Sequence, residues 1–338
     1  MKITEYIVTG GTGYVGYVVV KELIARGYSP IKVITRSKKN IERFKDLDVN
    51  FVFGDILDRD FIFKQISPES VVFHLAGIVD ISSYDNSMME KVNVEGCINI
   101  VDACIEKKVK KLIYTSSVAI IEPLKNQEIM SEPNEIKIDN FTNEYAKTKA
   151  IATKYIIDKT SLGELNAVVL YPSAIIGPYD YYISNVGQVV VDYINHKIFA
   201  YVKGGYNFVD VRDVAEGIIN AYEKGRSGEG YILSGEVISI KQMFLILNEK
   251  LARNKLPMKL PLWLVKKVLP LVELHYRIKK KKPIFSSCSL STINQNCNFN
   301  NTKAKEELGF NPRSVKEGLN DTVEWFYENK KDLINPPL

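Results

Sequence analysis

Tyr145 and Lys149 form the pair in this chain whose types and spacing point most directly to chemistry. A separation of four residues places both side chains on one face of a helix. A lysine ammonium beside a phenol favours the phenolate, so the pair predicts a lowered tyrosine pKa and proton transfer near neutral pH. The pattern alone is weak evidence, because Tyr155 and Tyr276 also precede a lysine by four positions.

Hydroxyl groups gather at the end of a predicted strand, in the run Leu-Ile-Tyr-Thr-Ser-Ser over residues 112–117. In an open parallel sheet the carboxyl ends of the strands face the ligand crevice. A hydroxyl placed there can polarise a carbonyl group as charge develops on its oxygen. The alternative is a helix cap or a turn, which are common uses of Ser and Thr.

Glycines recur at every third position in Thr-Gly-Gly-Thr-Gly-Tyr-Val-Gly, at Gly10, Gly13 and Gly16. An apolar run before them predicts a strand over residues 3–8, and helical spacing after them predicts a helix over residues 14–26. A strand, a glycine turn and a helix in this order predict a phosphate site, where free N–H groups and the helix dipole favour a dinucleotide pyrophosphate. A glycine-rich surface turn is the alternative.

Short apolar strands alternate with helices through the first half of the chain, which predicts a doubly wound parallel sheet, the α/β Rossmann fold. Residues 1–172 are expected to form the dinucleotide-binding domain, with returns to it near 205–233. Residues 173–204 and 234–330 are expected to form a smaller C-terminal substrate lobe. The predicted strands are 3–8, 31–35, 50–53, 71–75, 111–115 and 167–171, and the predicted helices are 15–26, 41–45, 59–66, 88–107 and 142–160.

Arg36 lies just after the second predicted strand, in Ile-Thr-Arg-Ser-Lys-Lys. Dinucleotide folds that select NAD usually place an acidic residue here, on the ribose 2′-hydroxyl, whereas arginine suits a 2′-phosphate. Arg36, aided by Ser37 or Lys39, therefore favours NADP over NAD. An exposed loop of positive charge is the alternative.

Bulk properties are those of an ordinary globular protein: 338 residues and a net charge of +5. The mild charge gives no reason to expect a nucleic acid partner. The four cysteines form no C-x-x-C pair and the three histidines are scattered, so no metal site is expected. No secretory signal is visible, which favours a cytoplasmic protein.

No apolar run is long enough to cross a bilayer, so no integral membrane segment is expected. Residues 260–282 combine an interrupted apolar stretch with the lysine run 279–282. They fit either an amphipathic element on a membrane surface or, the interpretation favoured here, an apolar helix over a substrate pocket followed by a solvated loop.

Taken together, the motifs resemble the extended, epimerase/dehydratase-like branch of the short-chain dehydrogenase/reductase superfamily. Within it they are closer to the dihydroflavonol-reductase-like and hopanoid-associated-epimerase-like groups. The resemblance covers nearly the whole chain, and the ordered set of motifs carries it. The matching segments are residues 9–16, 54–56, 74–77, Asn93, 115–117, Tyr145 with Lys149, Pro172-Ser173 with Gly177-Pro178, 208–215 and 301–312.

The resemblance implies roles for individual residues. Ser117 would be the catalytic hydroxyl, with Ser116 as a neighbour that could be confused with it, and Tyr145 the acid/base. Lys149 would assist Tyr145 and hold the ribose. The cofactor would be bound by Gly10, Thr12, Gly13, Tyr14, Val15 and Gly16 at the pyrophosphate, by Asp55 and Ile56 at the adenine, by Leu75, Ala76 and Gly77 along the channel, and by Pro172 and Ser173 at the nicotinamide.

Three functions are compared. The first is an NADP-dependent reductase that acts on an aldehyde, a ketone or a dihydroflavonol-like carbonyl, with Tyr145 as proton donor. The second is an NAD(P)-dependent nucleotide-sugar epimerase or dehydratase, which Tyr171 disfavours because many such enzymes have arginine there. The third, a non-catalytic dinucleotide sensor, is disfavoured because Ser117, Tyr145 and Lys149 are all present. In each case the partner is a small molecule, and helices 88–107 and 142–160 could pair two copies into a homodimer.

Overall fold

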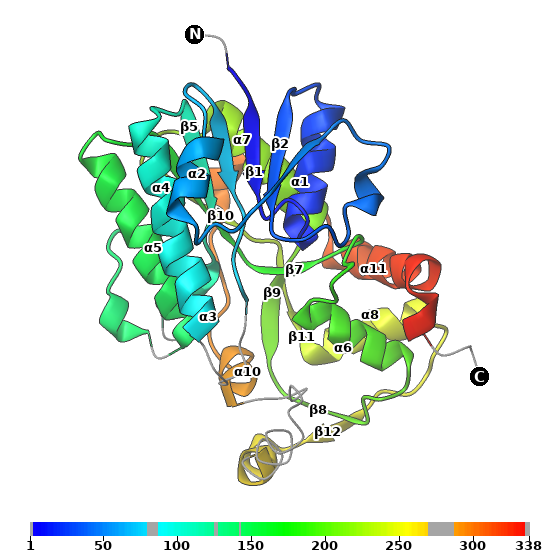
Figure 1. Ribbon diagram of the computed structural model, residues 1–338. Helices are drawn as coiled ribbons and strands as arrows, with labels where there is room; N and C mark the ends of the chain where they lie inside the picture. Colours follow the sequence, from blue (N-terminus) through cyan, green and yellow to red (C-terminus); the bar gives the residue numbers. More distant parts are fainter. Residues whose placement is uncertain (1–2, 80–86, 125–127, 142, 270–286, 335–338) are drawn as a thin grey trace.

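The computed structural model describes residues 3–79, 87–124, 128–141, 143–269 and 287–334. Its centre is one sheet of seven parallel strands in the order β10-β6-β5-β4-β1-β2-β3 (Figure 1). The predicted doubly wound α/β fold is confirmed. The strands are β1 (Tyr6–Thr9), β2 (Ile31–Thr35), β3 (Asn50–Phe53), β4 (Val71–His74), β5 (Lys111–Thr115), β6 (Ala167–Pro172) and β10 (Gly230–Leu233).

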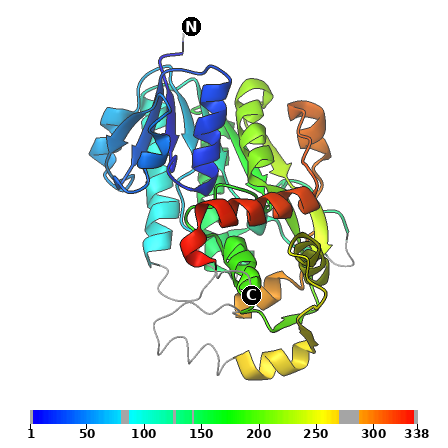
Figure 2. The ribbon, with the colours of Figure 1, turned by 90° about the vertical axis from the view of Figure 1, so that its right-hand side faces the viewer.

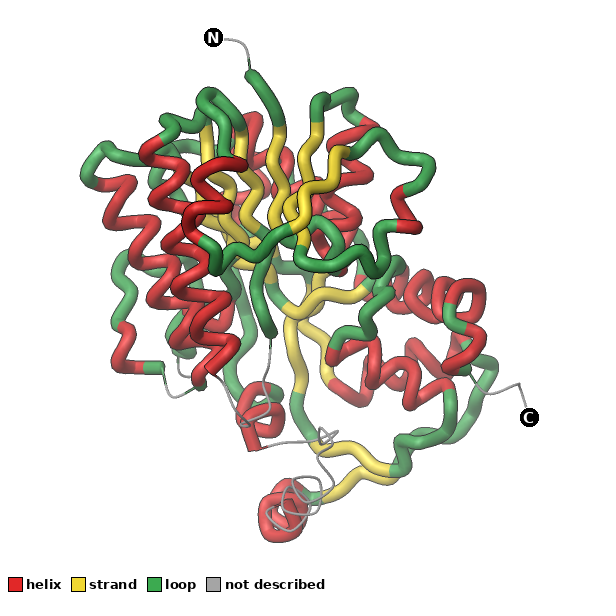
Figure 3. The backbone as a smooth tube through the Cα atoms, in the orientation of Figure 1, coloured by secondary structure: helices red, strands yellow, loops and turns green. Residues whose placement is uncertain are grey.

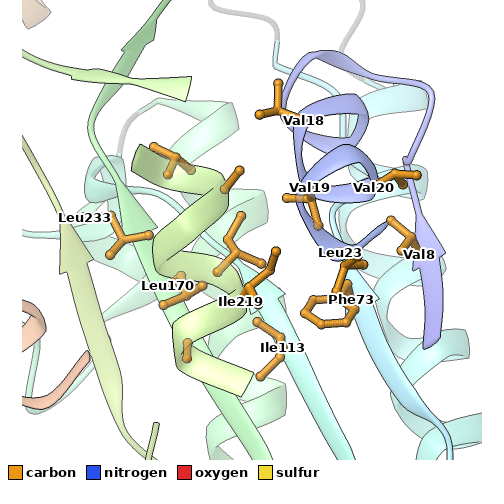
Figure 4. Close-up of a cluster of buried hydrophobic side chains, with 14 of the residues drawn as sticks. Val8, Val18, Val19, Val20, Leu23, Phe73, Ile113, Leu170, Ile219 and Leu233 are labelled. Carbon is orange, nitrogen blue, oxygen red and sulfur yellow. The ribbon is translucent and has the colours of Figure 1, made fainter. Parts of the chain in front are cut away.

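Helices cover both faces of this sheet, because successive strand residues point to opposite sides and both sides are apolar (Figure 3). Ile7 of β1 and Val72 of β4 face the side covered by α2, α4 and α5. Val8 of β1 and Phe73 of β4 face the opposite side, which is covered by α1 and α7. Figure 4 shows α1 and α7 side by side over the second face. The covering helices are α1 (Tyr14–Ala25), α7 (Val211–Lys224), α2 (Arg59–Gln65), α4 (Gly96–Glu106) and α5 (Glu144–Ser161).

A smaller lobe lies beyond the carboxyl ends of the central strands, and α11 runs across the middle of the molecule beside it (Figure 2). Its three-stranded sheet packs with α6, α8 and α11 around an apolar cluster of its own. A two-stranded sheet, β8 with β12, lies at the end of the molecule away from the N-terminus. The lobe elements are β7 (Ala174–Ile176), β9 (Gly205–Asp210), β11 (Glu236–Ser239), β8 (Ala200–Val202), β12 (Met258–Leu260), α6 (Asn185–Ile194), α8 (Ile240–Lys250), α10 (Ser287–Thr292) and α11 (Val315–Asn329).

The predicted helix over residues 88–107 is interrupted. It divides into α3 (Ser87–Glu90), a π-helical segment (Lys91–Glu95) and α4. Propensity does not reveal a π turn, which inserts one residue per turn and shifts the faces of the helix. The remaining short elements are the 3₁₀ helices Glu42–Phe44, Val118–Ile120, Ile138–Asn140 and Lys331–Leu333 and the π segment Ala304–Leu308.

The expected return to the central sheet near residues 205–233 is only partly seen. β10 and α7 join the central fold, whereas β9 pairs with β7 and β11 in the small sheet. Conversely, residues 304–310, which were expected in the lobe, pack against α7. A Cβ at Gly217 of α7 would lie 2.9 Å from the Leu233 side chain of β10 and 3.3 Å from the Phe310 ring, so glycine permits close packing on both sides.

Within these described residues, no helix is both long and apolar enough to cross a membrane. Most of the predicted segment 260–282 lies outside the described residues, which end at 269 and resume at 287.

Candidate functional site

The glycine turn is built for close backbone contact. Gly10 has a φ of +71°, and the Gly13 N–H donates to its carbonyl at 2.9 Å. A Cβ on Gly10 would lie 2.6 Å from the Ala76 nitrogen, and one on Gly16 would lie 2.1 Å from the Gly10 oxygen. Helix α1 starts with Gly13 at its N-cap and no side-chain cap, so its first N–H groups are left for a ligand. This cradle fits a pyrophosphate.

The strand order places the predicted site residues in a row along one edge of the sheet. Arg36 follows β2, the glycine turn follows β1, residues 75–77 follow β4, residues 116–117 follow β5, and Ser173 follows β6. An extended ligand lying across the carboxyl ends of these five strands would meet each group in turn.

After β2 and β3, at the end of the row where the family resemblance predicts the adenosine, a positive and a negative side chain lie close together. The Arg36 guanidinium lies 3.9 Å from the Asp55 carboxylate, and both side chains are exposed, at 58% and 40%. Asp55 also accepts a hydrogen bond from the Leu57 N–H at 3.1 Å. The Thr12 hydroxyl lies 3.2 Å from that of Thr35, which joins the glycine turn to the end of β2.

Lys149 carries its ammonium group into the interior between β4 and β5. The side chain is 6% exposed, and Nζ donates to the Thr115 carbonyl at 2.8 Å and to the Tyr114 hydroxyl at 3.4 Å. A Cβ on Gly77 would lie 3.4 Å from Nζ. Burial lowers the pKa of Lys149 to about 8.

Tyr145 lies in the first turn of α5, one helical turn before Lys149. A hydrogen bond from Ser117 lowers the pKa of Tyr145, but burial acts more strongly and the pKa is raised above its usual value. The sequence-based expectation of a lowered pKa is therefore wrong for the protein without a ligand. The reason is geometric: Thr115 and Tyr114 hold the Lys149 ammonium, and desolvation of Tyr145 dominates.

The neighbouring residues Ser116 and Ser117 have different hydrogen-bond partners. Ser117 faces Tyr145, and its Oγ accepts a hydrogen bond from the Ala119 N–H at 3.1 Å. Ser116 is buried, with Oγ 2.7 Å from the Thr153 hydroxyl of α5. Ser117 thus caps the 3₁₀ helix Val118–Ile120, as the alternative interpretation expected, and its catalytic role stays a prediction, whereas Ser116 joins the end of β5 to α5.

The residues after β6 form the end of the row where the family resemblance predicts the nicotinamide. Pro172 ends the strand, and the Ser173 N–H donates to the Leu233 carbonyl at 3.1 Å. Ser173 Oγ and Thr115 Oγ1 are both buried, and neither has a hydrogen-bond partner among the described residues. Buried hydroxyls without partners are rare, so this end fits a polar ligand group.

Two supporting residues had no assigned role from sequence. Asn93, in the π segment, accepts from the Ile78 N–H at 2.8 Å and donates to the Thr148 hydroxyl at 3.1 Å, joining the chain after β4 to α5. His74 lies 2.7 Å from the Thr9 hydroxyl, and burial together with the charge of Lys149 lowers its pKa to about 3. Its neutral ring stacks on Tyr114. Only their positions in the matched motifs could have indicated them.

Together these groups can bind a dinucleotide along the strand ends and move a proton at the Tyr145 hydroxyl. In the same described part of the chain, no three His, Cys, Asp or Glu side chains gather in a way that could hold a metal ion.

Comparison with known proteins agrees with this geometry. A model of the 3-beta hydroxysteroid dehydrogenase/isomerase family matches residues 7–238. A putative dihydroflavonol 4-reductase from Synechocystis is 30% identical over 334 residues, covering 95% of this chain and 94% of that protein. The crystal structure of gox2253 has a TM-score of 0.83 at 29% identity and covers 96% and 98% of the two chains. DesIV, a dTDP-glucose 4,6-dehydratase from Streptomyces venezuelae solved with NAD and TYD, has a TM-score of 0.78 at 19% identity, covering 97% and 98%.

Comparing the variants Gly10→Ala and Gly27→Ala separates the cost of atomic overlap from the cost of a left-handed backbone conformation. Both glycines have φ in the left-handed region, but nothing lies within 4 Å of a Cβ at Gly27. Gly27→Ala should cost about 1 kcal/mol of unfolding free energy. Gly10→Ala should cost about 2 kcal/mol more, because its Cβ overlaps the Ala76 backbone. Urea unfolding measures both, and equal costs would contradict the close approach.

Lys149→Met tests the buried ammonium through the pH dependence of stability. The pKa of Lys149 in the folded chain is about 8, against 10.5 ordinarily, so the unfolded chain binds more protons between these values. Stability of the ligand-free wild type should therefore rise with pH across that window relative to Lys149→Met, by about 3 kcal/mol. Unfolding free energies measured at several pH values check this, and parallel curves would show that Lys149 is not desolvated.

Proposed function

Because the chain belongs to the 3-beta hydroxysteroid dehydrogenase/isomerase family, within the extended short-chain dehydrogenases/reductases that use NAD(P), we propose that it is an NADP-dependent reductase of a carbonyl compound. One observation carries the proposal. Tyr145 lies one helical turn before Lys149 on α5, and the buried Lys149 ammonium donates to the Thr115 carbonyl at 2.8 Å, at the carboxyl end of β5.

NADPH, when bound, supplies the hydride that reduces the carbonyl carbon. Ser117 orients the carbonyl oxygen by a hydrogen bond, and Tyr145 donates the proton that this oxygen needs. The raised pKa of Tyr145 keeps it protonated before reaction, which suits a proton donor. Lys149 would hold the ribose hydroxyls, and its charge would stabilise the tyrosinate left after proton transfer.

The substrate we propose is an aldehyde, a ketone or a dihydroflavonol-like compound. The name of the Synechocystis relative, a putative dihydroflavonol 4-reductase, supports a reductase. Tyr171 also supports it: the side chain is 1% exposed and packs against Gly230, so it offers no cation to a sugar nucleotide.

A nucleotide-sugar epimerase or dehydratase is the second candidate, favoured by the structural similarity to DesIV. Such an enzyme oxidises and re-reduces its substrate with one bound dinucleotide. Retention of the cofactor through purification would favour this candidate, whereas a reductase must exchange it in every turnover.

Tyr145→Phe tests the proton donor. We expect turnover of NADPH with a panel of aldehydes and ketones to fall by roughly 10²–10⁴-fold, the usual contribution of a positioned acid, while the affinity for NADPH is kept. Tyr155→Phe is the matched control, since Tyr155 lies on the same helix with Lys159 four residues later, but its hydroxyl donates to Asp102. Full turnover by Tyr145→Phe would overturn the assignment.

Arg36→Ser tests the choice of NADP. Loss of a charged hydrogen bond to the 2′-phosphate should weaken NADP binding by roughly 10–100-fold and leave NAD binding nearly unchanged. Lys38→Ala, which removes a positive charge from the same loop, is the control. Tighter binding of NAD than NADP by the wild type, measured by titration calorimetry, would contradict the proposed role of Arg36.

A further inference from the structure

The helical residues 262–269 carry apolar side chains on two faces. Leu262, Val265 and Leu269 pack inward against an apolar cluster that contains Val202 and Leu290. The other face leaves Trp263 exposed at 62%, Val268 at 46% and Leu264 at 37%. A helix that only covered a pocket would not need this second apolar face.

The neighbouring strands add two more exposed apolar side chains. Phe199 is 80% exposed and Met258 61% exposed, and the Met258 N–H donates to the Phe199 carbonyl at 2.8 Å. Strand β12 ends at Leu260, directly before the helix. We call residues 197–203 and 255–269 the distal tip, because they lie at the end of the molecule opposite the N-terminus (Figures 1 and 2).

All the charged side chains of the distal tip are positive. Neither residues 195–209 nor residues 250–269 contain an aspartate or glutamate. Within the described chain, no carboxylate pairs with Lys259, Lys266 or Lys267. The exposed lysines of the tip are Lys197, Lys203, Lys255, Lys259, Lys266 and Lys267.

We propose that the distal tip binds the surface of an anionic lipid bilayer. The exposed apolar side chains would enter the region between headgroups and acyl chains, where tryptophan is favoured, and the lysines would contact lipid phosphates. Lys267 already lies 5.4 Å from the ring of Trp263, so cation and ring face the same surface. The helix does not cross the bilayer, because its eight described residues are less than half of a membrane span.

A second copy of this chain is a poorer occupant of the tip. Two such surfaces would bring together like charges with no acidic residue to separate them, which opposes pairing. An anionic membrane offers an apolar region for the exposed apolar side chains and phosphate groups for the lysines. This inference uses no residue of the cofactor edge and does not depend on which carbonyl compound is reduced.

Tryptophan fluorescence tests the proposal on the full-length protein. The chain has two tryptophans, and the second, Trp325, is buried at 6% exposure, so vesicle-dependent changes report on Trp263. Vesicles of phosphatidylcholine with phosphatidylglycerol should shift the emission to shorter wavelength, and brominated lipids should quench it. Phosphatidylcholine alone should have little effect, and Trp263→Phe should abolish the signal.

Vesicle co-sedimentation separates charge at the tip from net charge. Lys266→Glu with Lys267→Glu should weaken binding to anionic vesicles at least tenfold, as should added salt. Lys45→Glu with Lys64→Glu changes the net charge equally on exposed lysines elsewhere and should bind like the wild type. Unchanged thermal unfolding and NADPH affinity verify that each variant is folded.

Two results would overturn the proposal. One is binding to anionic vesicles that the tip variants do not weaken, or no binding at all. The other is self-association without lipid, measured by light scattering, that Trp263→Phe or the Lys266/Lys267 variant removes, since the tip would then serve a second copy. Loss of carbonyl reduction alone would bear on the proposed function and leave the membrane proposal standing.

Discussion

Lys149 places a positive charge inside the protein, and the arrangement of the site follows from how that charge is held. From α5, its ammonium reaches the Thr115 carbonyl and the Tyr114 hydroxyl of β5. Ser116 and Thr153 hold the helix there. A buried cation costs desolvation energy, and here that cost appears as a lowered pKa of Lys149. Burial of His74 lowers the pKa of its ring, and the charge of Lys149 lowers it further.

The same packing also sets the pKa of Tyr145. Burial raises the pKa of Tyr145, and the hydrogen bond from Ser117 offsets only part of that rise. A cofactor whose ribose hydroxyls took over the Lys149 ammonium would rearrange its contacts. Its charge would then bear more on Tyr145 and less on the Thr115 carbonyl.

Local patterns predict the central sheet well. Strands 31–35, 50–53 and 111–115 agree to the residue with β2, β3 and β5, because each is a short run rich in β-branched and aromatic residues. Other features depend on distant contacts. Residues 116 and 117 have the same side chain and are distinguished only by Thr153 on α5. The π segment around Asn93, the pairing of β9 with β11 and the sign of the Tyr145 pKa shift likewise arise from tertiary packing.

Tyr14 joins the glycine turn to the smaller lobe. It is the first residue of α1, directly after the glycine turn, yet its buried hydroxyl donates to the Gly177 carbonyl at 2.7 Å, just after β7 of the lobe. Burial, with Asp180 and Asp210 nearby, raises its pKa, so the hydroxyl stays a donor. The lobe sheet is therefore positioned against the phosphate turn by a bond that spans 163 residues of sequence. Residues of the lobe can then diversify to suit a new substrate while β7 keeps its place above the cofactor edge.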